Sequence, residues 1–383
     1  MRISKKISFI NFKNKTNIKN LNKILKKTLS EKNEILDSLK PNYKYSFNKK
    51  LINKYKNKNL RLIGMGGSIL GMKAIYNFLN KKIRNKIYFV DNLDIKIKDK
   101  SAKPVNIIIS KSGNTLETIA NSNLIIKKNK KNIFITEKKN SYLRELAIKL
   151  KAEIVDHNNF IGGRYSVLSE VGMLPSSLVG LDEKKFKQFN KLVNNKTFIN
   201  NLLNNVANIY KLVIKKKYNS VILNYDKNSD DLFKWYQQLV AESLGKKNKG
   251  ILPIISTMPK DNHSVMQLYL DGNKNNFFTF FNVIEKKSEK MKKNQLQKNF
   301  EFLKNKNLYA IINSQKIATE NVFSKKKLPF RSILVNYRDE ESIGELFTFF
   351  ILETILLGKL MKINPYDQPA VELIKKETFR LLN

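Results

Sequence analysis

The stretch SKSGNTLET, residues 110–118, gathers small hydrogen-bonding side chains directly after the apolar run of residues 105–109. A loop that leaves a strand needs one or two turn residues, so this many hydroxyl and amide groups exceed what turning requires. The apolar residues that follow suit a helix, whose free N–H groups and positive dipole end favour an anion. We expect a phosphate site, although ordinary helix capping would favour the same residue types. The polar residues are Ser110, Ser112, Asn114, Thr115 and Thr118, and Lys111 adds a positive charge.

A glycine-rich stretch, IGMGGSILG at residues 63–71, follows the first expected strand and opens a helix. Gly66 and Gly67 let the backbone approach a ligand closely, and the Ser68 hydroxyl could bind it. The stretch is not a dinucleotide fingerprint, because Ile69 stands where a glycine is needed, and it lacks the Gly-Lys-Ser/Thr of a nucleotide P-loop. A glycine turn for helix–strand packing alone, with Ser68 as a cap, remains open.

Two charged residues could act on a reacting carbon. Arg164, one of eight arginines, follows two glycines in GGRYSVLS, and a fixed guanidinium there could stabilise negative charge that develops on oxygen, as in enolate chemistry. Glu242 falls in the last turn of the helix expected from Asp231, which Gly245 would end. The negative dipole end disfavours ionisation there and suits a general base. A structural salt bridge for Arg164 and a merely solvated Glu242 are the alternatives.

The histidine of NHSVMQLYLDG, His263, is expected at the start of another helix, where the positive dipole end keeps an imidazole neutral and able to exchange protons. A capping histidine is the structural alternative. Near the C-terminus, NPYDQPAVELIKKE places Gln368 just before a helix that a proline starts and that carries Lys375 and Lys376.

The composition limits the class of protein. A chain of 383 residues with 42% hydrophobic residues is long enough for two globular domains. The absence of cysteine and the presence of two histidines argue against zinc and other metal centres. The net charge of +41 suggests nucleic acid, but the lysines are dispersed and greatly outnumber the arginines, so we expect no nucleic-acid role. With neither a signal peptide nor a membrane span expected, a cytoplasmic location follows.

Alternation of short apolar runs with helical stretches predicts an α/β fold of two doubly wound domains with parallel central sheets and flanking helices. We expect the first domain over 1–190, with helices up to about residue 58 packed outside it, and the second over 191–383. The most apolar segment, 346–360, is interrupted by charges and is expected to be a buried core helix. Expected strands lie at 60–66, 86–91, 105–110, 132–136 and 152–157, and then at 220–225, 252–256, 277–285 and 332–337.

Taken together, these segments resemble the glucose-6-phosphate isomerase (phosphoglucose isomerase) family. The matching motifs stand in family order from about residue 60 to 376, and they would be weak singly. Ile374 stands where the family commonly has glycine, which leaves Lys376 as the alternative to Lys375. The motifs are GMGGS, SKSGNTLET, GGRYSVLSEVG, QQLVAESLGK, HSVMQL and DQPAVELIK.

The resemblance implies a role for each matching residue. Glu242 matches the base that moves a proton between substrate carbons 1 and 2, and Arg164 matches the arginine that stabilises the enediolate. His263 matches the ring-opening histidine, which in the family comes from the neighbouring subunit, and Lys375 matches the lysine at the ring oxygen. The implied phosphate and sugar contacts are Gly67, Ser68, Ser110, Lys111, Ser112, Thr115, Gln238 and Gln368.

The implied activity is the reversible isomerisation of glucose 6-phosphate and fructose 6-phosphate in glycolysis and gluconeogenesis, without metal or organic cofactor, in a homodimer that binds no membrane. One alternative is an isomerase that also accepts mannose 6-phosphate. Another is a non-catalytic sensor that binds a sugar phosphate, or nucleic acid, through the same fold.

Overall fold

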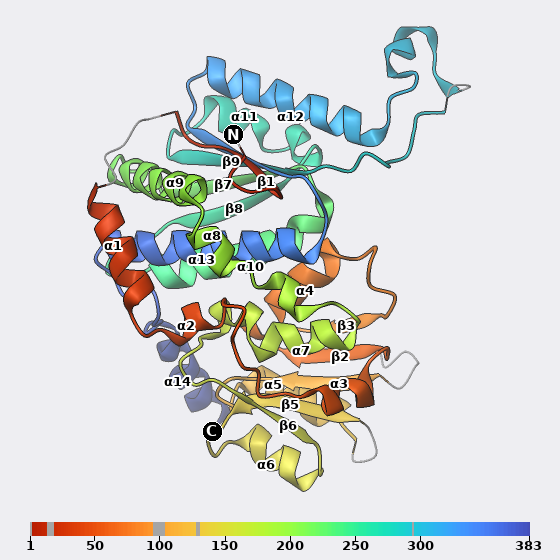
Figure 1. Ribbon diagram of the computed structural model, residues 1–383, viewed down its shortest axis with the longest axis vertical. Coiled ribbons are helices and arrows are strands. Elements are labelled where there is room, and N and C mark those ends of the chain that lie inside the picture. Colours follow the sequence, from red (N-terminus) through yellow and green to blue (C-terminus); the bar gives the residue numbers. More distant parts are fainter. Residues whose placement is uncertain (1, 14–18, 95–103, 128–130, 293–294) are drawn as a thin grey trace.

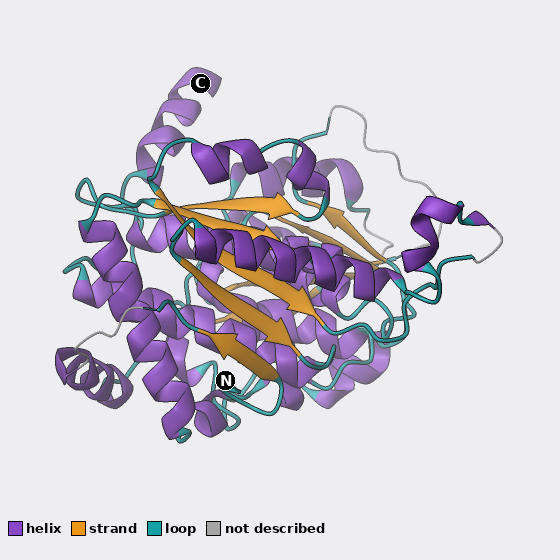
Figure 2. Ribbon diagram, turned by 90° about the horizontal axis from the view of Figure 1, so that it is seen from above, coloured by secondary structure: helices purple, strands orange, loops and turns teal. Residues whose placement is uncertain are grey.

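The computed structural model describes residues 2–13, 19–94, 104–127, 131–292 and 295–383. Two five-stranded sheets lie one above the other in Figure 1, with the helices α10 (Asp230–Leu244) and α13 (Glu340–Leu360) between them. Figure 2 shows helices on both sides of the strands, which is the layering expected of a doubly wound fold.

The first sheet is entirely parallel, in the order β3-β2-β4-β5-β6. Its central strands β2 and β4 are buried along their whole length, as apolar runs in a parallel sheet must be when helices cover both faces. All five strands predicted for this region are confirmed. The elements are β2 (Leu60–Gly64), α4 (Gly67–Phe78), β3 (Ile87–Val90), β4 (Val105–Ile109), α5 (Leu116–Ile125), β5 (Asn132–Glu137), α6 (Tyr142–Lys149) and β6 (Glu153–His157).

The second sheet has the order β1-β10-β9-β7-β8, and all four predicted strands are confirmed. Its parallel strands repeat the order of the first four strands in the first sheet, and the N-terminal strand β1 (Ile7–Ile10) pairs antiparallel with β10. The elements are η3 (Lys227–Ser229), β7 (Asn219–Asn224), β8 (Leu252–Thr257), η4 (Lys260–His263), α11 (Met266–Asp271), β9 (Asn276–Val283), η6 (Lys298–Leu303), α12 (Leu308–Lys325) and β10 (Phe330–Val335).

Carboxylates lie at the carboxyl edge of the second sheet. Asp230 accepts a hydrogen bond from the Asn224 amide at 2.7 Å and from the Thr257 hydroxyl at 3.2 Å. The Asp261 carboxylate accepts one from the backbone N–H of Thr257 at 2.8 Å. The polar groups at the ends of β7 and β8 are therefore bonded within the chain.

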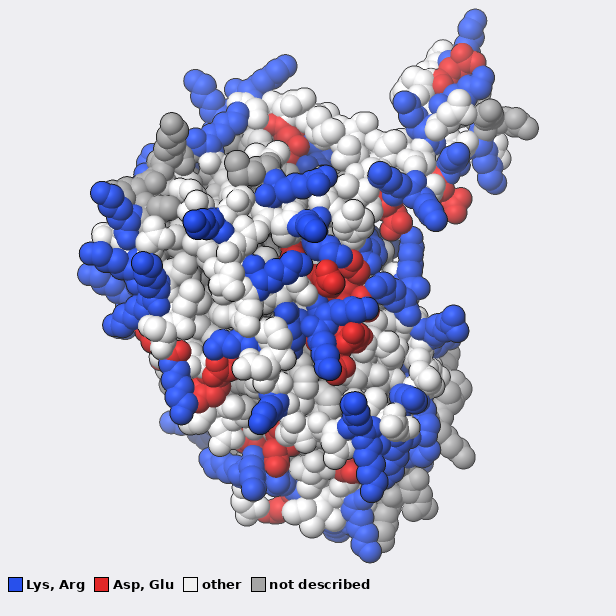
Figure 3. All heavy atoms as spheres, viewed as in Figure 1, with Lys and Arg blue, Asp and Glu red and all other residues white. Residues whose placement is uncertain are grey.

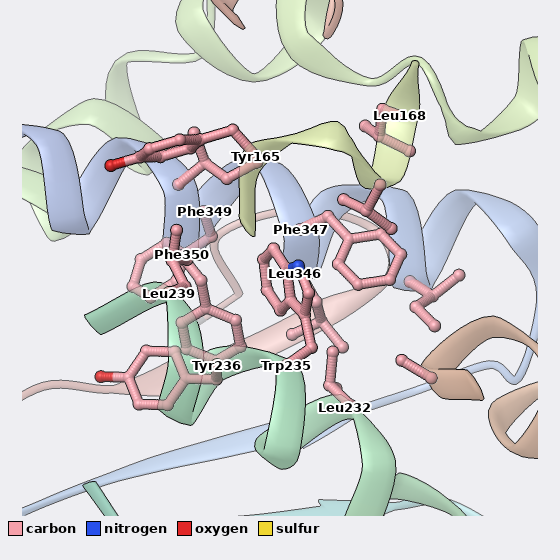
Figure 4. Close-up of a cluster of buried hydrophobic side chains, with 14 of the residues drawn as sticks. Tyr165, Leu168, Leu232, Trp235, Tyr236, Leu239, Leu346, Phe347, Phe349 and Phe350 are labelled. Carbon is pink, nitrogen blue, oxygen red and sulfur yellow. The ribbon is translucent and has the colours of Figure 1, made fainter. Parts of the chain in front are cut away.

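The core between the sheets is aromatic. Trp235 of α10 packs edge-on against Phe347 of α13, with ring centroids 4.7 Å apart, and Figure 4 shows the surrounding side chains. Helix α13 is buried from Ser342 to Gly358, which confirms the predicted core helix. Within the described residues, no helix combines the length and apolarity needed to cross a membrane.

The N-terminal segment differs from its prediction as helices outside the first domain. Strand β1 extends the second sheet, and helix α1 (Lys19–Ser30) packs against α13 and α9 (Lys196–Ile214) of the second half. Helix α3 (Lys49–Tyr55) packs on α7 (Glu170–Leu178), as expected. The prediction was wrong for β1 because this strand pairs with a strand far along the chain, whereas helical spacing in the sequence reports only local structure. A boundary at residue 190 stays a prediction. The remaining elements are α2 (Glu34–Asp37), η1 (Gly163–Leu168), η2 (Glu183–Phe186) and α8 (Phe189–Val193).

A buried lysine anchors the N-terminal segment to the first half. The Lys187 ammonium lies 5.0 Å and 4.9 Å from the ring centroids of Tyr43 and Tyr45 and donates hydrogen bonds to the carbonyls of Ser38 and Leu168. Leu168 is the last residue of η1, so this anchor fixes the end of the segment that begins next to Arg164.

Lysine and arginine side chains are spread over the face seen in Figure 3, with acidic groups among them. This dispersion agrees with the pattern read in the sequence and differs from the single basic stripe typical of a nucleic-acid interface.

Candidate active site

The loops after β2 and β4 flank the point where the first sheet reverses its winding. β2 and β4 are neighbours, while the strands that follow them lie on opposite sides, β3 next to β2 and β5 next to β4. In open parallel sheets, ligands bind beyond the carboxyl ends of the strands at such a point. Both motifs singled out in the sequence, the glycine-rich turn and the Ser110–Thr118 stretch, lie here.

The glycine-rich turn is fixed by a contact between two backbones. Gly66 has a φ of +52°, which disfavours other residues, and a Cβ at position 66 would lie 2.9 Å from the Gln238 amide nitrogen. A Cβ at Gly67 would lie 2.1 Å from the carbonyl carbon of Gly163. The turn therefore places Ser68, in the first turn of α4, beside the segment that carries Arg164.

We predict that Gly67→Ala destabilises the fold by about 3 kcal/mol, since the overpacked methyl meets backbone, which cannot rotate away. Gly162→Ala is the matched control: its φ is −67° and a Cβ there has no neighbour closer than 4.0 Å. The control should leave the free energy of unfolding unchanged or raise it by up to about 1 kcal/mol. Urea unfolding measures both, and equal stabilities would contradict the tight contact.

The Ser110–Thr115 loop holds its hydroxyls at the end of β4. The Ser110 and Thr115 hydroxyl oxygens are 2.8 Å apart, and the Ser112 hydroxyl accepts a hydrogen bond from the N–H of Asn114. Thr115 is the N-cap of α5, but its side chain makes no capping hydrogen bond. The hydroxyl of Thr115 is thus turned to Ser110, which disfavours the simple capping interpretation.

Lys111, in the same loop, is half-buried. Burial lowers the pKa of its ammonium group; the charge of Glu137 opposes this shift, and the charge of Arg164 adds to it. The opposing effects of Glu137 and Arg164 indicate that both charges lie near the Lys111 ammonium.

Arg164 is buried and makes contacts on every side of its guanidinium. Nε donates to the Ser243 hydroxyl at 2.8 Å, and Nη2 donates to the carbonyls of Pro365 at 2.9 Å and Asp367 at 3.1 Å. Nη1 donates to the Gln368 side-chain oxygen at 2.8 Å. A planar fork with this many partners has one orientation.

Glu242 lies in the last turn of α10, as predicted, with its carboxylate partly exposed. Its Oε1 is 3.4 Å from Nη1 of Arg164, and its Oε2 accepts a hydrogen bond from the Gln238 amide at 3.1 Å. The structure thus brings together four predicted site residues from three segments of the chain: Arg164, Gln238, Glu242 and Gln368.

His263 and Lys375 are not joined to this cluster. His263 is exposed and is the last residue of η4, three residues before α11 begins. The prediction that it starts a helix was wrong, because His263 ends a short 3₁₀ turn and Ser264 and Val265 separate it from α11. It therefore lacks the dipole of a following helix.

Lys375 stands on the C-terminal helix α14 (Val371–Leu382), where its ammonium bonds Glu372 at 2.6 Å. No residue of this helix is buried among the described residues, and Lys376 is exposed as well. A surface pocket of about 610 Å³ lies between the loop after α10 and the segment before α14. Six large apolar side chains of α14 are exposed: Val371, Leu373, Ile374, Phe379, Leu381 and Leu382.

Two residues next to Arg164 and Glu242 were not predicted as part of the site. Ser243 and Tyr165 are both fully buried, and their hydroxyls are 2.8 Å apart. The available signal was a hydroxyl adjacent in sequence to each charged residue, in GGRYSVLS and AESLGK. Among the described residues, no group of three His, Asp or Glu side chains is arranged to hold a metal ion.

Residues 26–382 match the family model of phosphoglucose isomerase. The chain belongs to this family. A glucose-6-phosphate isomerase of Methanocaldococcus jannaschii is 36% identical, with 86% of this chain and 87% of that protein covered. Solved structures that are similar to this chain have the same fold.

Two solved structures share that fold. A hypothetical protein from Thermus thermophilus matches with a TM-score of 0.82 at 21% identity, over 95% of this chain and 94% of that one. A glucose-6-phosphate isomerase from Chlamydia trachomatis matches with a TM-score of 0.72 at 18% identity, over 87% of this chain and 71% of that one.

Proposed function

We propose that this protein is a glucose-6-phosphate isomerase, which interconverts glucose 6-phosphate and fructose 6-phosphate in glycolysis and gluconeogenesis in the cytoplasm. The observation that carries the proposal is the pairing of Arg164 with Glu242 beside a hydroxyl-rich loop at the switch point of the first sheet. The family membership supports it, and the two alternatives from the sequence are not favoured by the comparisons.

In the proposed mechanism the sugar phosphate is anchored at one end and reacts at the other. Ser110, Lys111, Ser112 and Thr115 hold the phosphate, while Gly67, Ser68, Gln238 and Gln368 contact the substrate. Binding energy at the phosphate then orients carbons 1 and 2 toward Glu242. This explains why neutral donors and one cation follow β4.

The chemistry requires one base and one cation. His263 and Lys375 open the ring, and Glu242 removes the proton from the carbon next to the carbonyl. Arg164 stabilises the negative oxygen of the resulting cis-enediolate, and Glu242 returns the proton to the neighbouring carbon. No oxidant or cofactor is consumed, because the oxidation of one carbon is balanced by the reduction of the other.

A labelling experiment tests this activity. Glucose 6-phosphate carrying deuterium at carbon 2 should lose part of the label to solvent and transfer the rest to carbon 1 when it is incubated with the protein. Fructose 6-phosphate that carries all of the deuterium at carbon 1, with none lost to solvent, would indicate a hydride shift and would reject proton transfer through a carboxylate.

The pH dependence of substrate binding should follow Lys111. Because its pKa lies below the ordinary value, the ammonium loses its charge at a lower pH than an exposed lysine would. We expect KM to begin to rise at a lower pH than the ordinary lysine pKa of 10.5 would give, since a neutral amine attracts the phosphate less. Lys111→Arg should move this rise to higher pH, and Lys111→Met should raise KM about 10- to 100-fold. An unchanged alkaline limb in Lys111→Arg would contradict the assignment.

We also propose that the protein is a homodimer in which His263 reaches the site of the neighbouring subunit. The exposure of His263 and of the apolar residues of α14 supports this arrangement. The dimer would cover α14 and bring Lys375 to the sugar.

Mixing two inactive variants tests the shared site. After denaturation and refolding together, Glu242→Gln and His263→Ala subunits should recover about a quarter of wild-type activity, since each mixed dimer regains one complete site. Refolding each variant alone is the control. No recovery in mixed dimers, verified by mass, would place His263 within its own subunit.

A further inference from the structure

A closed ring of hydrogen bonds holds the guanidinium of Arg164 through its Nε and Nη2 atoms. Arg164 Nε donates to Ser243 Oγ, the hydroxyls of Ser243 and Tyr165 are 2.8 Å apart, and Tyr165 Oη donates to the Pro365 carbonyl at 2.9 Å. Arg164 Nη2 donates to the same carbonyl and closes the ring. Figure 4 shows that Tyr165 lies at the border of the buried aromatic cluster.

The direction of each bond in the ring is determined. A guanidinium only donates and a carbonyl only accepts, so the single hydrogen of Tyr165 points to Pro365. Tyr165 Oη therefore accepts from Ser243, whose oxygen accepts from Arg164 Nε. Each hydroxyl gives one bond and receives one, and burial raises the pKa of Tyr165 and thereby keeps its hydrogen.

The third nitrogen of the guanidinium, Nη1, takes no part in the ring and faces the other residues of the candidate site. Nε and Nη2 are bound by the ring, whereas Nη1 contacts the Gln368 side chain and lies 3.4 Å from Glu242. The plane of a guanidinium is set by two of its nitrogens, so the ring also sets the direction of the third. The guanidinium carbon lies 5.1 Å from the Tyr165 ring centroid, which adds a contact on one face.

We propose that Ser243 and Tyr165 are positioning residues for the isomerisation, because their hydroxyls orient Arg164 so that Nη1 faces Glu242 and the reacting oxygens. This rests on the proposed role of Arg164. Without either hydroxyl the guanidinium keeps its charge but gains freedom to tilt, and a misplaced donor stabilises the enediolate less. Substrate binding through the Ser110–Thr115 loop is unaffected.

Steady-state kinetics of Ser243→Ala and Tyr165→Phe test the proposal. Each should lower kcat about 10- to 100-fold, with KM within about twofold of the wild type. The double variant should be no worse than the poorer single variant, since either change opens the ring. In an Arg164→Lys background, neither change should lower kcat further. Additive losses in that background would show that the hydroxyls act independently of Arg164 and would overturn the proposal.

A second buried serine–tyrosine pair provides the control. The hydroxyls of Ser256 and Tyr269 are also 2.8 Å apart, and Tyr269 belongs to a different hydrophobic cluster from Tyr165. Ser256→Ala and Tyr269→Phe should cost comparable thermal stability and leave kcat unchanged. A fall in kcat of the same size in these variants would attribute the effect to stability and overturn the proposal.

The outcomes separate this proposal from the proposed function. If Arg164→Lys lowers kcat while Ser243→Ala and Tyr165→Phe, both folded by circular dichroism, keep it, the positioning role fails and the function stands. If Arg164→Lys itself keeps full kcat, the proposed role of Arg164 fails and the ring has no catalytic group to orient.

Discussion

Replacing Glu242 with glutamine should lower kcat about 10³- to 10⁴-fold, because one carboxylate is proposed to carry the proton in both half-reactions. The amide keeps the size of the side chain and can keep the hydrogen bond with Gln238, but it cannot accept a proton from carbon. KM should change little, since the phosphate is held elsewhere. A coupled assay of fructose 6-phosphate formation measures both constants.

Exchange of the carbon 2 label provides a second measurement for this variant. Loss of deuterium to solvent should fall in parallel with kcat, because the same carboxylate exchanges its proton with water. Glu153→Gln is the control, since Glu153 also pairs with a cation, Lys54, but at the surface. If Glu242→Gln and Glu153→Gln show equal turnover, Glu242 is not the base.

Replacing Arg164 with lysine should lower kcat about 10²- to 10³-fold, the loss typical of removing a donor to a developing oxyanion. Lysine keeps the charge but lacks the planar fork that contacts Ser243, Pro365 and Gln368 at once. Part of the effect should appear as lower thermal stability, because two buried acceptors, Ser243 and Pro365, and the partly buried Gln368 lose their guanidinium donor. Isomerase kinetics and a melting curve separate the two contributions.

The control for this change is Arg144→Lys. Arg144 pairs with Asp156 at 2.7 Å and is partly exposed, so a lysine can replace it with little loss. Wild-type kcat in Arg164→Lys, with a melting temperature as low as expected, would mean that Arg164 serves the fold alone.

The parallel strands could be predicted because each is a short apolar run between helical stretches, as in residues 105–109 and 277–283. β1 could not, because Ile7–Ile10 pairs with a strand more than 320 residues later. Residue spacing within the N-terminal segment reports helices but contains no information on which sheet edge is open.

The site was predicted in part. Arg164, Gln238, Glu242 and Gln368 come from separate motifs, and the fold brings them together as the resemblance implied. Ser243 and Tyr165 were missed because a buried hydroxyl is recognised only by its partners. The position of Lys375 could not be read from the sequence, because the periodicity of α14 predicts a helix but not the surface against which it packs.

The repeated strand order gives the two sheets reversal points of the same design, and the polar groups at their carboxyl edges differ. At the first, hydroxyls and the Lys111 ammonium follow β4, where we propose that the phosphate binds. At the second, the carboxylates of Asp230 and Asp261 already accept the hydrogen bonds of the neutral donors at the strand ends. A phosphate would meet negative charge at that edge, so the second half contributes Gln238, Glu242 and Gln368 to the candidate site rather than an anion site of its own.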